Sequence, residues 1–556
     1  MKKITVAAAL IDCLRQEGIG TVFGLPGSQI LSLIDEIYRS HDMEFITTRH
    51  EQGASFGAFG YAAARRAPGV CLSTLGPGAT NLLTGVAAAF KGSVPVIALT
   101  AKGALHLHQK DAFQEINEVD IFRPVTKWSY MLTHADEAPS IMRKAFRVTL
   151  SGRPGPVHIS LPSNLLSTEI DYAPVRPERY RPLWDQPFAA FSESMSQELA
   201  GLLAQARTPV IMAGEEIRFD GAEDSLQGLA ELWNVPVVTA LHFSDVMKAD
   251  HPLYMGPVSA DGWQCADRTL QTADLVLAVG VHLDFLTTKF RPSFIGDETT
   301  LIHVSKDPER IGCVYPVDMG ITAGASTFLA GVENLVRDEG LRQAERPELA
   351  LWKAQWLETR NAWGKMTDTP IKPQFIAYTV RTSVPARTAL VSEGGNFIKF
   401  VRACTDPDGP LSFFVAEDYG AVGSGFPIAM GVKAADPSRP VVALLGDGGF
   451  MLDSGDFETA VRSNLALVGV IFNDSGFGNI RTYQKNTYGG RYACDFTNPD
   501  FAQFARLCGG WGARVERPDE LEGALMEAFS RNVPSLIDVT TDPCELGDAL
   551  HAPASR

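Results

Sequence analysis

The sequence predicts an α/β protein with three doubly wound domains, each built on a parallel sheet. The chain has 556 residues, which is enough for about three domains of ordinary size. Short apolar runs alternate with helix-length segments along nearly all of it, as is typical of parallel α/β domains. Two polar stretches, 167–188 and 339–373, interrupt the alternation and predict connections. We therefore expect domains at 1–165, 189–335 and 370–545.

Composition excludes some classes of function. The 65 acidic residues outnumber the 49 Lys and Arg residues, and the net charge of -16 argues against nucleic-acid binding, which needs clustered cations. An anionic small ligand remains possible, because helix N-terminal amides can bind phosphate. No apolar run approaches the ~20 residues of a membrane span. The eight cysteines form no CxxC pair and are read as reduced thiols, so we predict a cytoplasmic protein with no membrane partner.

The first and third blocks resemble each other weakly. The segment 69–100 runs strand, Gly-Pro-Gly, helix, strand, and the segment 440–474 runs strand, Gly-Asp-Gly, helix, strand. Any two βαβ units share such a pattern. The alternative is that two related domains cooperate on one ligand. The pattern by itself leaves both explanations open.

Two neighbouring strands of the third block end in polar residues. The strand 441–445 is followed by Gly446-Asp447-Gly448-Gly449, and the strand 467–472 is followed by Asn473, Asp474 and Ser475. Ligands of parallel sheets lie beyond the carboxyl ends of the strands, so Asp447 and Asn473 should emerge side by side. We expect the next helix at about 453–463, with its N-terminal amides facing a phosphate. Carboxylate, amide and carbonyl oxygens suit Mg²⁺, so a magnesium–diphosphate site is predicted.

Gly-Asp-Gly by itself marks many hairpin turns, but an Asn at the end of the following strand strengthens the signal. Together these residues resemble the cofactor motif of the thiamine-diphosphate-dependent enzymes. The resemblance implies metal ligation by Asp447, Asn473 and the main-chain carbonyl of Ser475. Asp474 stands where a second Asn is usual, which leaves that set intact. The resemblance also implies cofactor contacts from Gly446, Gly448, Gly449, Phe477 and Gly478.

Two further segments of the third block extend the resemblance. In "VSEGGNFIKF" it assigns Gly395 and Asn396 to the diphosphate, although a Gly pair before a helix is often only a tight turn. In "DYGAVGSGFPIAMG" it assigns Gly420 and Val422 to the cofactor's pyrimidine ring, with Val422 where Met, Leu or Ile is more usual. The alternative for this second segment is a Gly-rich helix start packed in a core.

Glu51 is the candidate acid for the other end of the cofactor. The mechanism needs a carboxyl group, in a dry place, that shares a proton with the pyrimidine ring nitrogen. Glu51 begins a helix of small apolar residues, where the simple explanation is a first-turn Glu favoured by the helix dipole. The "HEQGA" segment, however, is similar to the catalytic-glutamate motif of the family. We therefore expect Glu51 to be catalytic and buried.

Over its whole length the chain looks like the acetolactate synthase, pyruvate oxidase and benzaldehyde lyase branch. That branch implies a pyrimidine-binding, a central Rossmann-like and a diphosphate-binding domain, assembled as a homodimer or homotetramer in which two chains build each site. The segments "FGLPGSQI" and "STLGPGATNLLTG" place Gly27 and Gly76 at the cofactor. The "DAFQE" loop places Phe113 and Gln114 beside the substrate as catalytic residues.

Three features depart from that branch. His282 and Leu286 stand where flavin-binding members carry arginines, so we predict that the central domain has lost FAD. Lys91 stands where Met is usual, and it is either a cation for a substrate carboxylate or an exposed helix-end Lys. The segments "VSEGGN" and "DLVLAVGVHLDF" are more similar to those of aldehyde lyases and CoA-thioester lyases.

His106 and His108 precede the "AFQ" segment, and they are either a proton shuttle or loop residues.

We expect an enzyme that uses thiamine diphosphate and Mg²⁺ to decarboxylate a small 2-oxo acid and join the remainder to a second carbonyl compound. Within the same chemistry, the alternative is an acyloin or aldehyde lyase, or a 2-hydroxyacyl- or oxalyl-CoA lyase. Outside it, the alternative is a regulatory protein that binds the cofactor without catalysis. A dinucleotide-dependent oxidoreductase is disfavoured because neither Gly-rich loop reads GxGxxG.

Overall fold

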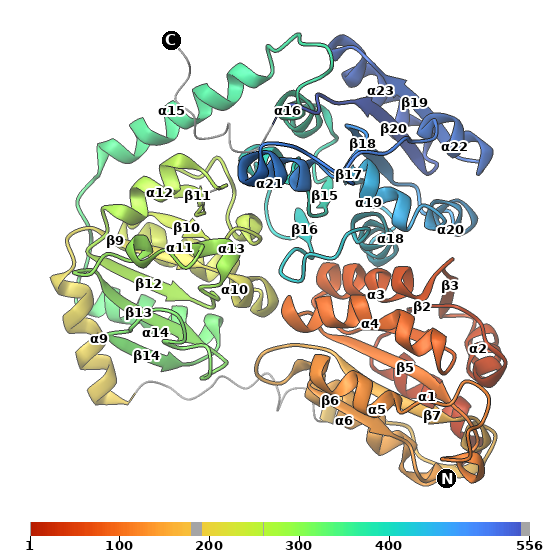
Figure 1. Ribbon diagram of the computed structural model, residues 1–556. Helices are drawn as coiled ribbons and strands as arrows, with labels where there is room; N and C mark the ends of the chain where they lie inside the picture. Colours follow the sequence, from red (N-terminus) through yellow and green to blue (C-terminus); the bar gives the residue numbers. More distant parts are fainter. Residues whose placement is uncertain (1, 180–191, 260, 546–556) are drawn as a thin grey trace.

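The computed structural model describes residues 2–179, 192–259 and 261–545 and contains three six-stranded sheets (Figure 1). Every strand pair in these three sheets is parallel. The predicted α/β class with three doubly wound sheets is therefore confirmed. The sheets fall within 21–162, 209–322 and 389–540, and each lies inside one of the three expected domains.

The first domain has the strand order β3-β2-β4-β5-β7-β6. Its sheet strands are β2 (Thr21–Gly24), β3 (Glu44–Thr47), β4 (Gly69–Ser73), β5 (Val96–Lys102), β6 (Trp128–Met131) and β7 (Val157–Pro162). Its helices are α1 (Val6–Gln16), α2 (Leu31–Ser40), α3 (Glu51–Arg65), α4 (Pro77–Lys91), α5 (Glu118–Phe122), α6 (Ala138–Leu150) and α7 (Ser163–Leu166).

The central domain has the order β11-β10-β9-β12-β13-β14. Its strands are β9 (Pro209–Ala213), β10 (Val237–Thr239), β11 (Tyr254–Pro257), β12 (Leu275–Val279), β13 (Thr300–Ser305) and β14 (Met319–Thr322). Its helices are α9 (Glu193–Gln205), α10 (Glu215–Asp220), α11 (Glu223–Trp233), α12 (Gln264–Gln271), α13 (Phe285–Thr288) and α14 (Ala325–Asp338). The long helix α15 (Pro347–Trp363) leads from this domain to the third (Figure 1).

The third domain has the order β16-β15-β17-β18-β20-β19. Its strands are β15 (Ala389–Ser392), β16 (Phe413–Val415), β17 (Val441–Gly446), β18 (Val468–Asn473), β19 (Trp511–Val515) and β20 (Ser535–Thr540). Its helices are α16 (Pro373–Ser383), α17 (Ile398–Ala403), α18 (Gly425–Ala435), α19 (Asp447–Leu452), α20 (Asp456–Arg462), α21 (Gly478–Tyr488), α22 (Phe501–Leu507) and α23 (Pro518–Arg531).

The inner strands of each sheet are mostly apolar because helices cover both faces. All residues of β9, β12 and β15 are buried, and so are all those of β4 and β5. Continuous apolar strands of this kind are characteristic of parallel sheets, whereas a half-exposed sheet would show alternation. This is why short apolar runs sufficed to predict the class.

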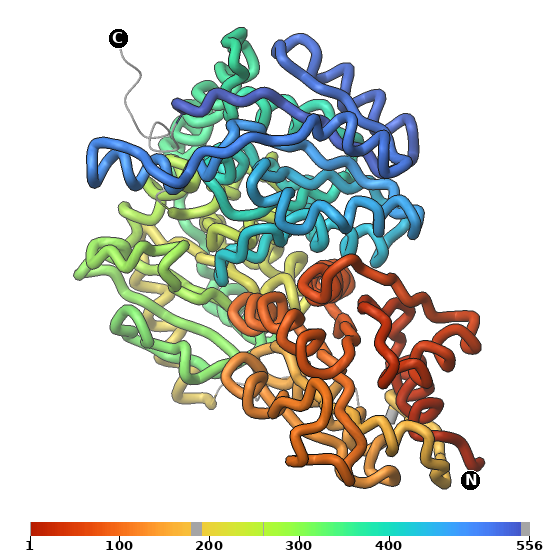
Figure 2. Tube along the Cα trace, turned by 45° about the vertical axis from the view of Figure 1, so that its right-hand side comes forward, coloured from red at the N-terminus to blue at the C-terminus, as the bar shows by residue number. Residues whose placement is uncertain are grey.

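Small residues on α3 and α18 join the first domain to the third (Figure 2). A Cβ on Gly60 would collide with the Ile428 carbonyl oxygen, and one on Gly431 would collide with the Gly57 carbonyl oxygen. The two helix backbones are therefore in direct contact, which only glycine permits at such positions. One apolar core contains residues of both the first and the third domain. A second apolar core contains residues of both the central and the third domain.

The structure corrects two local expectations. The segment 167–188, predicted as a connection, contains the strand β8 (Glu169–Tyr172), which pairs antiparallel with β1 (Lys2–Thr5). Ile170 and Tyr172 alternate into the core and so hold this strand in place. Residues 180–188 of the segment lie outside the described part. The helix expected at about 453–463 is confirmed as α20, but a separate helix that was not expected, α19, precedes it and begins at Asp447 itself. The residues 447–449, expected as a turn, are therefore helical, and Gly446 is the last residue of β17. None of the helices in the described ranges is long and apolar enough to cross a membrane.

Candidate active site

The predicted residues of the first domain meet at the carboxyl edge of its sheet. Gly27 follows β2, Glu51 follows β3, Gly76 follows β4 and Gln114 follows β5. A Cβ on Gly76, which has a φ of +59°, would lie 2.6 Å from the Gln114 carbonyl oxygen. A Cβ on Gly27 would lie 2.5 Å from the Thr74 Cβ, so the turns after β2 and β4 are equally close. Glycine is required where these loops touch.

Glu51 is held inside this edge. It begins α3 and is 5% exposed, which confirms the predicted burial. Its Oε2 accepts a hydrogen bond of 2.9 Å from the Asn81 amide, and a Cβ on Gly78 would lie 3.1 Å from its Oε1. His50 caps the helix by accepting from the Gln52 backbone N–H, so that histidine has a structural role. The Asn81 amide and the close packing against Gly78 fix the carboxyl group in one place.

Glu115 closes the loop that carries Phe113 and Gln114. Its Oε1 lies 2.8 Å from the His108 Nδ1 and accepts the Gln109 backbone N–H at 3.0 Å. The Gln109 N–H and the His108 ring lower the pKa of Glu115 to about 2. Phe113 is 81% exposed at the tip. His108 therefore holds the loop, in line with the second of the two explanations for the histidines.

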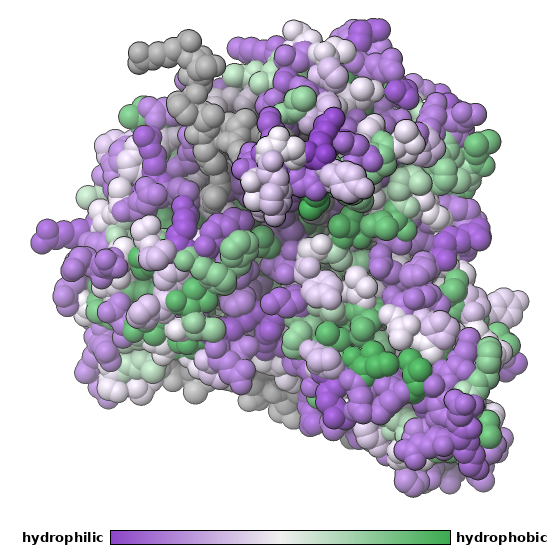
Figure 3. Space-filling view, viewed as in Figure 1, coloured by the Kyte–Doolittle hydropathy of each residue, from purple (hydrophilic) through white to green (hydrophobic). Residues whose placement is uncertain are grey.

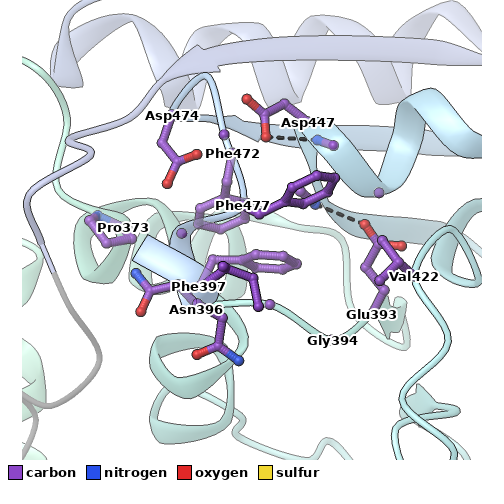
Figure 4. Close-up of a pocket in the computed structure, with 18 of the residues that line it drawn as sticks. Pro373, Glu393, Gly394, Asn396, Phe397, Val422, Asp447, Phe472, Asp474 and Phe477 are labelled. Atoms are coloured by element: carbon purple, nitrogen blue, oxygen red, sulfur yellow. Dashed lines mark hydrogen bonds between the residues drawn. The ribbon is translucent and has the colours of Figure 1, made fainter. Parts of the chain in front are cut away.

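The predicted residues of the third domain enclose a cavity of about 400 Å³ (Figure 4). That volume is within the range of small-ligand sites. Among the residues that line it are ten predicted for the cofactor: Gly395, Asn396, Gly420, Val422, Gly446, Asp447, Gly448, Gly449, Phe477 and Gly478. Leu286 of the central domain closes one side, and no described residue of the first domain lines the cavity. One chain thus supplies only part of the predicted cofactor site.

The oxygens of Asp447 and Asn473 converge on one point beside this cavity. The Asn498 amide nitrogen donates to the Asp447 Oδ2 at 2.8 Å and to the Asn473 Oδ1 at 2.9 Å. A Cβ on Gly448 would lie 2.7 Å from Phe477, so the turn after β17 fits only without a side chain. Two oxygens that share one donor can also share one cation, and their chemistry fits Mg²⁺.

Ser475 completes the loop at this point. Its φ of +57° turns its N–H to the Asp447 Oδ2 at 2.7 Å. The buried Arg481 donates to the Ser475 carbonyl at 2.7 Å and to the Asp474 carbonyl at 2.9 Å, and so fixes the loop. Burial, with the nearby Asp447 charge, raises the pKa of Asp474 to about 7. The site therefore concentrates negative charge where a cation would be stabilised.

Two residues at this site were not predicted from the sequence. Asn498 lies in an irregular segment after α21, where no pattern marks it. Asp538 is fully buried in β20, and its Oδ1 accepts from the Asn473 Nδ2 at 2.8 Å. The sequence did contain a signal for Asp538, since it is a lone acid inside an apolar strand. That strand, β20, pairs with β18, which ends at Asn473. This hydrogen bond points the Asn473 oxygen toward Asp447.

Replacing Asp538 with alanine should weaken Mg²⁺-dependent cofactor binding by about 10–100-fold, the usual effect of losing a partner that orients a metal ligand. The Asn473 amide would then be free to turn its nitrogen toward the metal position. Titrating the variant with Mg²⁺ at fixed thiamine diphosphate measures the effect. Asp538→Asn, which can still present an oxygen, is the matched control. An alanine variant that binds Mg²⁺ like the wild type would contradict this orienting role.

Family models match all three domains. They are described as the thiamine pyrophosphate enzyme N-terminal TPP binding domain at residues 4–121, the central domain at 196–332, and the C-terminal TPP binding domain at 393–539. Thiamine pyrophosphate is the same compound as thiamine diphosphate. The two TPP binding models cover Glu51 and the Asp447–Asn473 pair respectively.

Full-length relatives agree with these models. The chain is 34% identical to a probable acetolactate synthase large subunit of Methanocaldococcus jannaschii and 33% identical to that of Methanococcus aeolicus, each over 97% of this chain and 92% of the relative. It is 31% identical to the acetolactate synthase isozyme 3 large subunit of Escherichia coli, over 98% of this chain and 96% of that protein. Its two cofactor-facing sheet edges and these relatives agree: the chain belongs to the thiamine pyrophosphate enzyme family, as an acetolactate synthase-like member.

Proposed function

We propose that this protein decarboxylates a small 2-oxo acid such as pyruvate and joins the remaining acyl unit to a second carbonyl compound. The observation that carries the proposal is the convergence of Asp447 and Asn473 beside a cavity lined by the predicted cofactor residues. The relatives named as acetolactate synthases support the same reaction. When bound, thiamine diphosphate would supply the electron sink that decarboxylation needs.

The chain's own residues divide the work of holding this cofactor. Asp447, Asn473 and the Ser475 carbonyl would hold Mg²⁺ on the diphosphate, with Gly395 and Asn396 beside it. Gly420 and Val422 would support the pyrimidine from the cavity wall. Glu51 would share a proton with the pyrimidine nitrogen, and its burial excludes water from that proton. Phe113 and Gln114 would contact the substrate from the neighbouring loop.

We further propose that two chains build each site, in a homodimer or homotetramer. Within one chain, Gln52 donates to Asp453 at 3.1 Å, and Asp453 directly follows the far end of α19 from Asp447. A six-residue helix is about 9 Å long, so the neighbour of Glu51, Gln52, contacts the end of α19 that lies away from the proposed metal ligand Asp447. Apolar side chains also gather on the face shown in Figure 3. In the third domain, Val422 is 42% and Leu452 59% exposed. A second copy would cover them and bring its own Glu51.

The product distinguishes the candidate reactions. Purified protein is incubated with Mg²⁺, thiamine diphosphate and a panel of 2-oxo acids, and CO₂ and coupled products are identified by mass. CO₂ release with a 2-hydroxy-2-methyl-3-oxo acid from pyruvate supports the proposal. Cleavage of acyloins or 2-hydroxyacyl thioesters without decarboxylation of 2-oxo acids would instead identify a lyase. Cofactor binding without turnover of any compound would identify a regulatory protein.

The central domain has its own side chains where a flavin nucleotide would bind, and we propose that it holds no FAD. At the end of β13, the Glu216 carboxylate accepts the Lys306 N–H at 3.0 Å and the Ser305 hydroxyl at 2.6 Å. A Cβ on Gly280, at the end of β12, would lie 2.5 Å from the Glu216 Cβ. Nucleotide phosphates of such sheets occupy this edge. Here the Glu216 carboxylate, and not a phosphate, accepts the backbone N–H of Lys306.

Glu215 fills the neighbouring space at the same edge. It pairs with the buried Arg310 and accepts the His282 backbone N–H at 3.2 Å. The Arg310 cation is thereby paired internally with Glu215 instead of being available to an anionic diphosphate. Burial raises the pKa of Glu216 to about 7, although the hydrogen bonds from Ser305 and Lys306 offset part of the rise.

We therefore expect the protein to purify without flavin, and its activity not to respond to added FAD. The absorbance spectrum of the native protein and chromatography of the cofactors released on denaturation measure this. Free FAD mixed with the denatured sample controls for losses during recovery. One FAD per chain in material purified without added flavin would contradict the expectation.

A further inference from the structure

Glu393 is a buried carboxylate that neither the metal set nor the diphosphate set includes. It directly follows β15 and is 1% exposed, yet it lines the cofactor cavity (Figure 4). One oxygen, Oε1, accepts the Gly446 N–H at 3.0 Å. The other, Oε2, accepts the Gly423 N–H at 3.2 Å and the Gly425 N–H at 3.4 Å. The side chain therefore connects two segments that are far apart in the sequence.

These two segments support opposite ends of the proposed cofactor. Gly423 and Gly425 follow Val422, which is assigned to the pyrimidine, and Gly446 precedes Asp447, which is assigned to the metal. Figure 4 shows Glu393 beside Val422, with one of its oxygens bonded to the turn that leads to Asp447. The carboxylate thus sits between the two halves of the site.

The surrounding glycines are shaped around this carboxylate. A Cβ on Gly449 would collide with its oxygens, and a Cβ on Gly425 would lie 3.2 Å from the Glu393 Cβ. Gly423 has a φ of +88°, which turns its N–H inward. Burial raises the pKa of Glu393 to about 7, although the three backbone N–H groups favour the charged form and offset part of the rise. A neutral side chain of similar shape would not serve the same donors.

We propose that Glu393 is a positioning residue that sets the spacing between the pyrimidine-supporting segment 420–425 and the metal-binding turn 446–449. The proposal rests on the proposed function, because it concerns the same cofactor. Its chemistry depends on two acceptor oxygens that face opposite ways. Glutamine has only one, so Glu393→Gln would set an NH₂ group against the N–H of either Gly446 or the Gly423–Gly425 pair. One of the two connections would then be lost.

The test compares the binding of thiamine diphosphate with the binding of inorganic pyrophosphate, which stands for the diphosphate half of the cofactor alone. Wild type, Glu393→Gln and Glu393→Asp, each purified full length and freed of cofactor, are titrated in Mg²⁺ with thiamine diphosphate and with inorganic pyrophosphate. Glu216→Gln is the matched control, since Glu216 is also a buried carboxylate that accepts a backbone N–H, that of Lys306, away from this cavity. Thermal unfolding establishes that each variant is folded, and Glu393→Asp replaces Glu393→Gln if the latter is not.

We expect Glu393→Gln to weaken thiamine diphosphate binding by about 10–100-fold, the usual effect of leaving a buried donor unpaired. Its pyrophosphate affinity should change by less than about threefold, because only the link between the halves is lost. The KM for the cofactor should rise more than kcat falls. A folded variant that binds thiamine diphosphate like the wild type, or that loses both ligands equally, overturns the positioning role. A wild type that binds neither ligand overturns the proposed function as well.

Discussion

Replacing Glu51 with glutamine is expected to lower kcat by about 10²–10⁴-fold, the usual contribution of a positioned proton-transfer group. Glutamine preserves the shape and can still accept from Asn81, which now reaches Glu51 at 2.9 Å. It cannot share a proton with the pyrimidine nitrogen. The cofactor dissociation constant should therefore change little, so the effect is confined to turnover.

The control for this variant is Glu44→Gln. Glu44 begins β3, the strand that leads toward Glu51, but it lies at the amino end of the strand, away from the site. Steady-state kinetics and a cofactor titration on both variants separate binding from turnover. A Glu51→Gln enzyme with more than about a tenth of the wild-type kcat would contradict the catalytic role.

Replacing Asp447 with alanine is the second large effect. Asp447 provides the only carboxylate of the proposed metal set, and its oxygens also accept N–H groups from Gly448 and Ser475 at 2.7 Å each. Removing it deletes a ligand and releases the loop after β18. We expect Mg²⁺-dependent cofactor binding to weaken by more than about a hundredfold, since even groups outside a ligand set contribute about 10–100-fold.

Calorimetric titration with Mg²⁺ and thiamine diphosphate measures this loss. Asp474→Asn is the informative comparison, because it restores the more usual residue beside the same ligands and should keep cofactor binding within a few-fold of the wild type. If Asp474→Asn abolished binding while Asp447→Ala retained it, the two neighbouring acids would have been assigned the wrong way round.

The main features of the third-domain site could be predicted because they follow from strand order. Asp447 and Asn473 end neighbouring parallel strands, so their meeting follows from topology and a turn signal. Glu51 could be predicted from its apolar helix and from the resemblance. In contrast, Glu393 reads as part of a tight turn, and its partners Gly423 and Gly446 lie 30 and 53 residues away.

Other features depended on contacts that no local pattern encodes. Asn498 reaches the metal ligands from an irregular segment, and its role is visible only once β17 and β18 are in place. The start of α19 at Asp447 was not predicted, because the glycines that follow it have a low helix propensity and favour a loop. In the structure Phe477 packs so closely on Gly448 that only a glycine fits there, and the glycine is part of the helix. Tertiary contacts, not propensity, decided both.

Mixing two inactive variants tests whether the first and third domains of different chains form one site. Glu51→Gln and Asp447→Ala chains are denatured together, refolded and assayed, with each variant refolded by itself as the control. If Glu51 of one chain serves the Asp447 of the other, each mixed pair regains one intact site, and activity returns well above that of either variant. If both residues served the same chain, every site would keep one defect, and a mixture as inactive as its components would contradict the shared site.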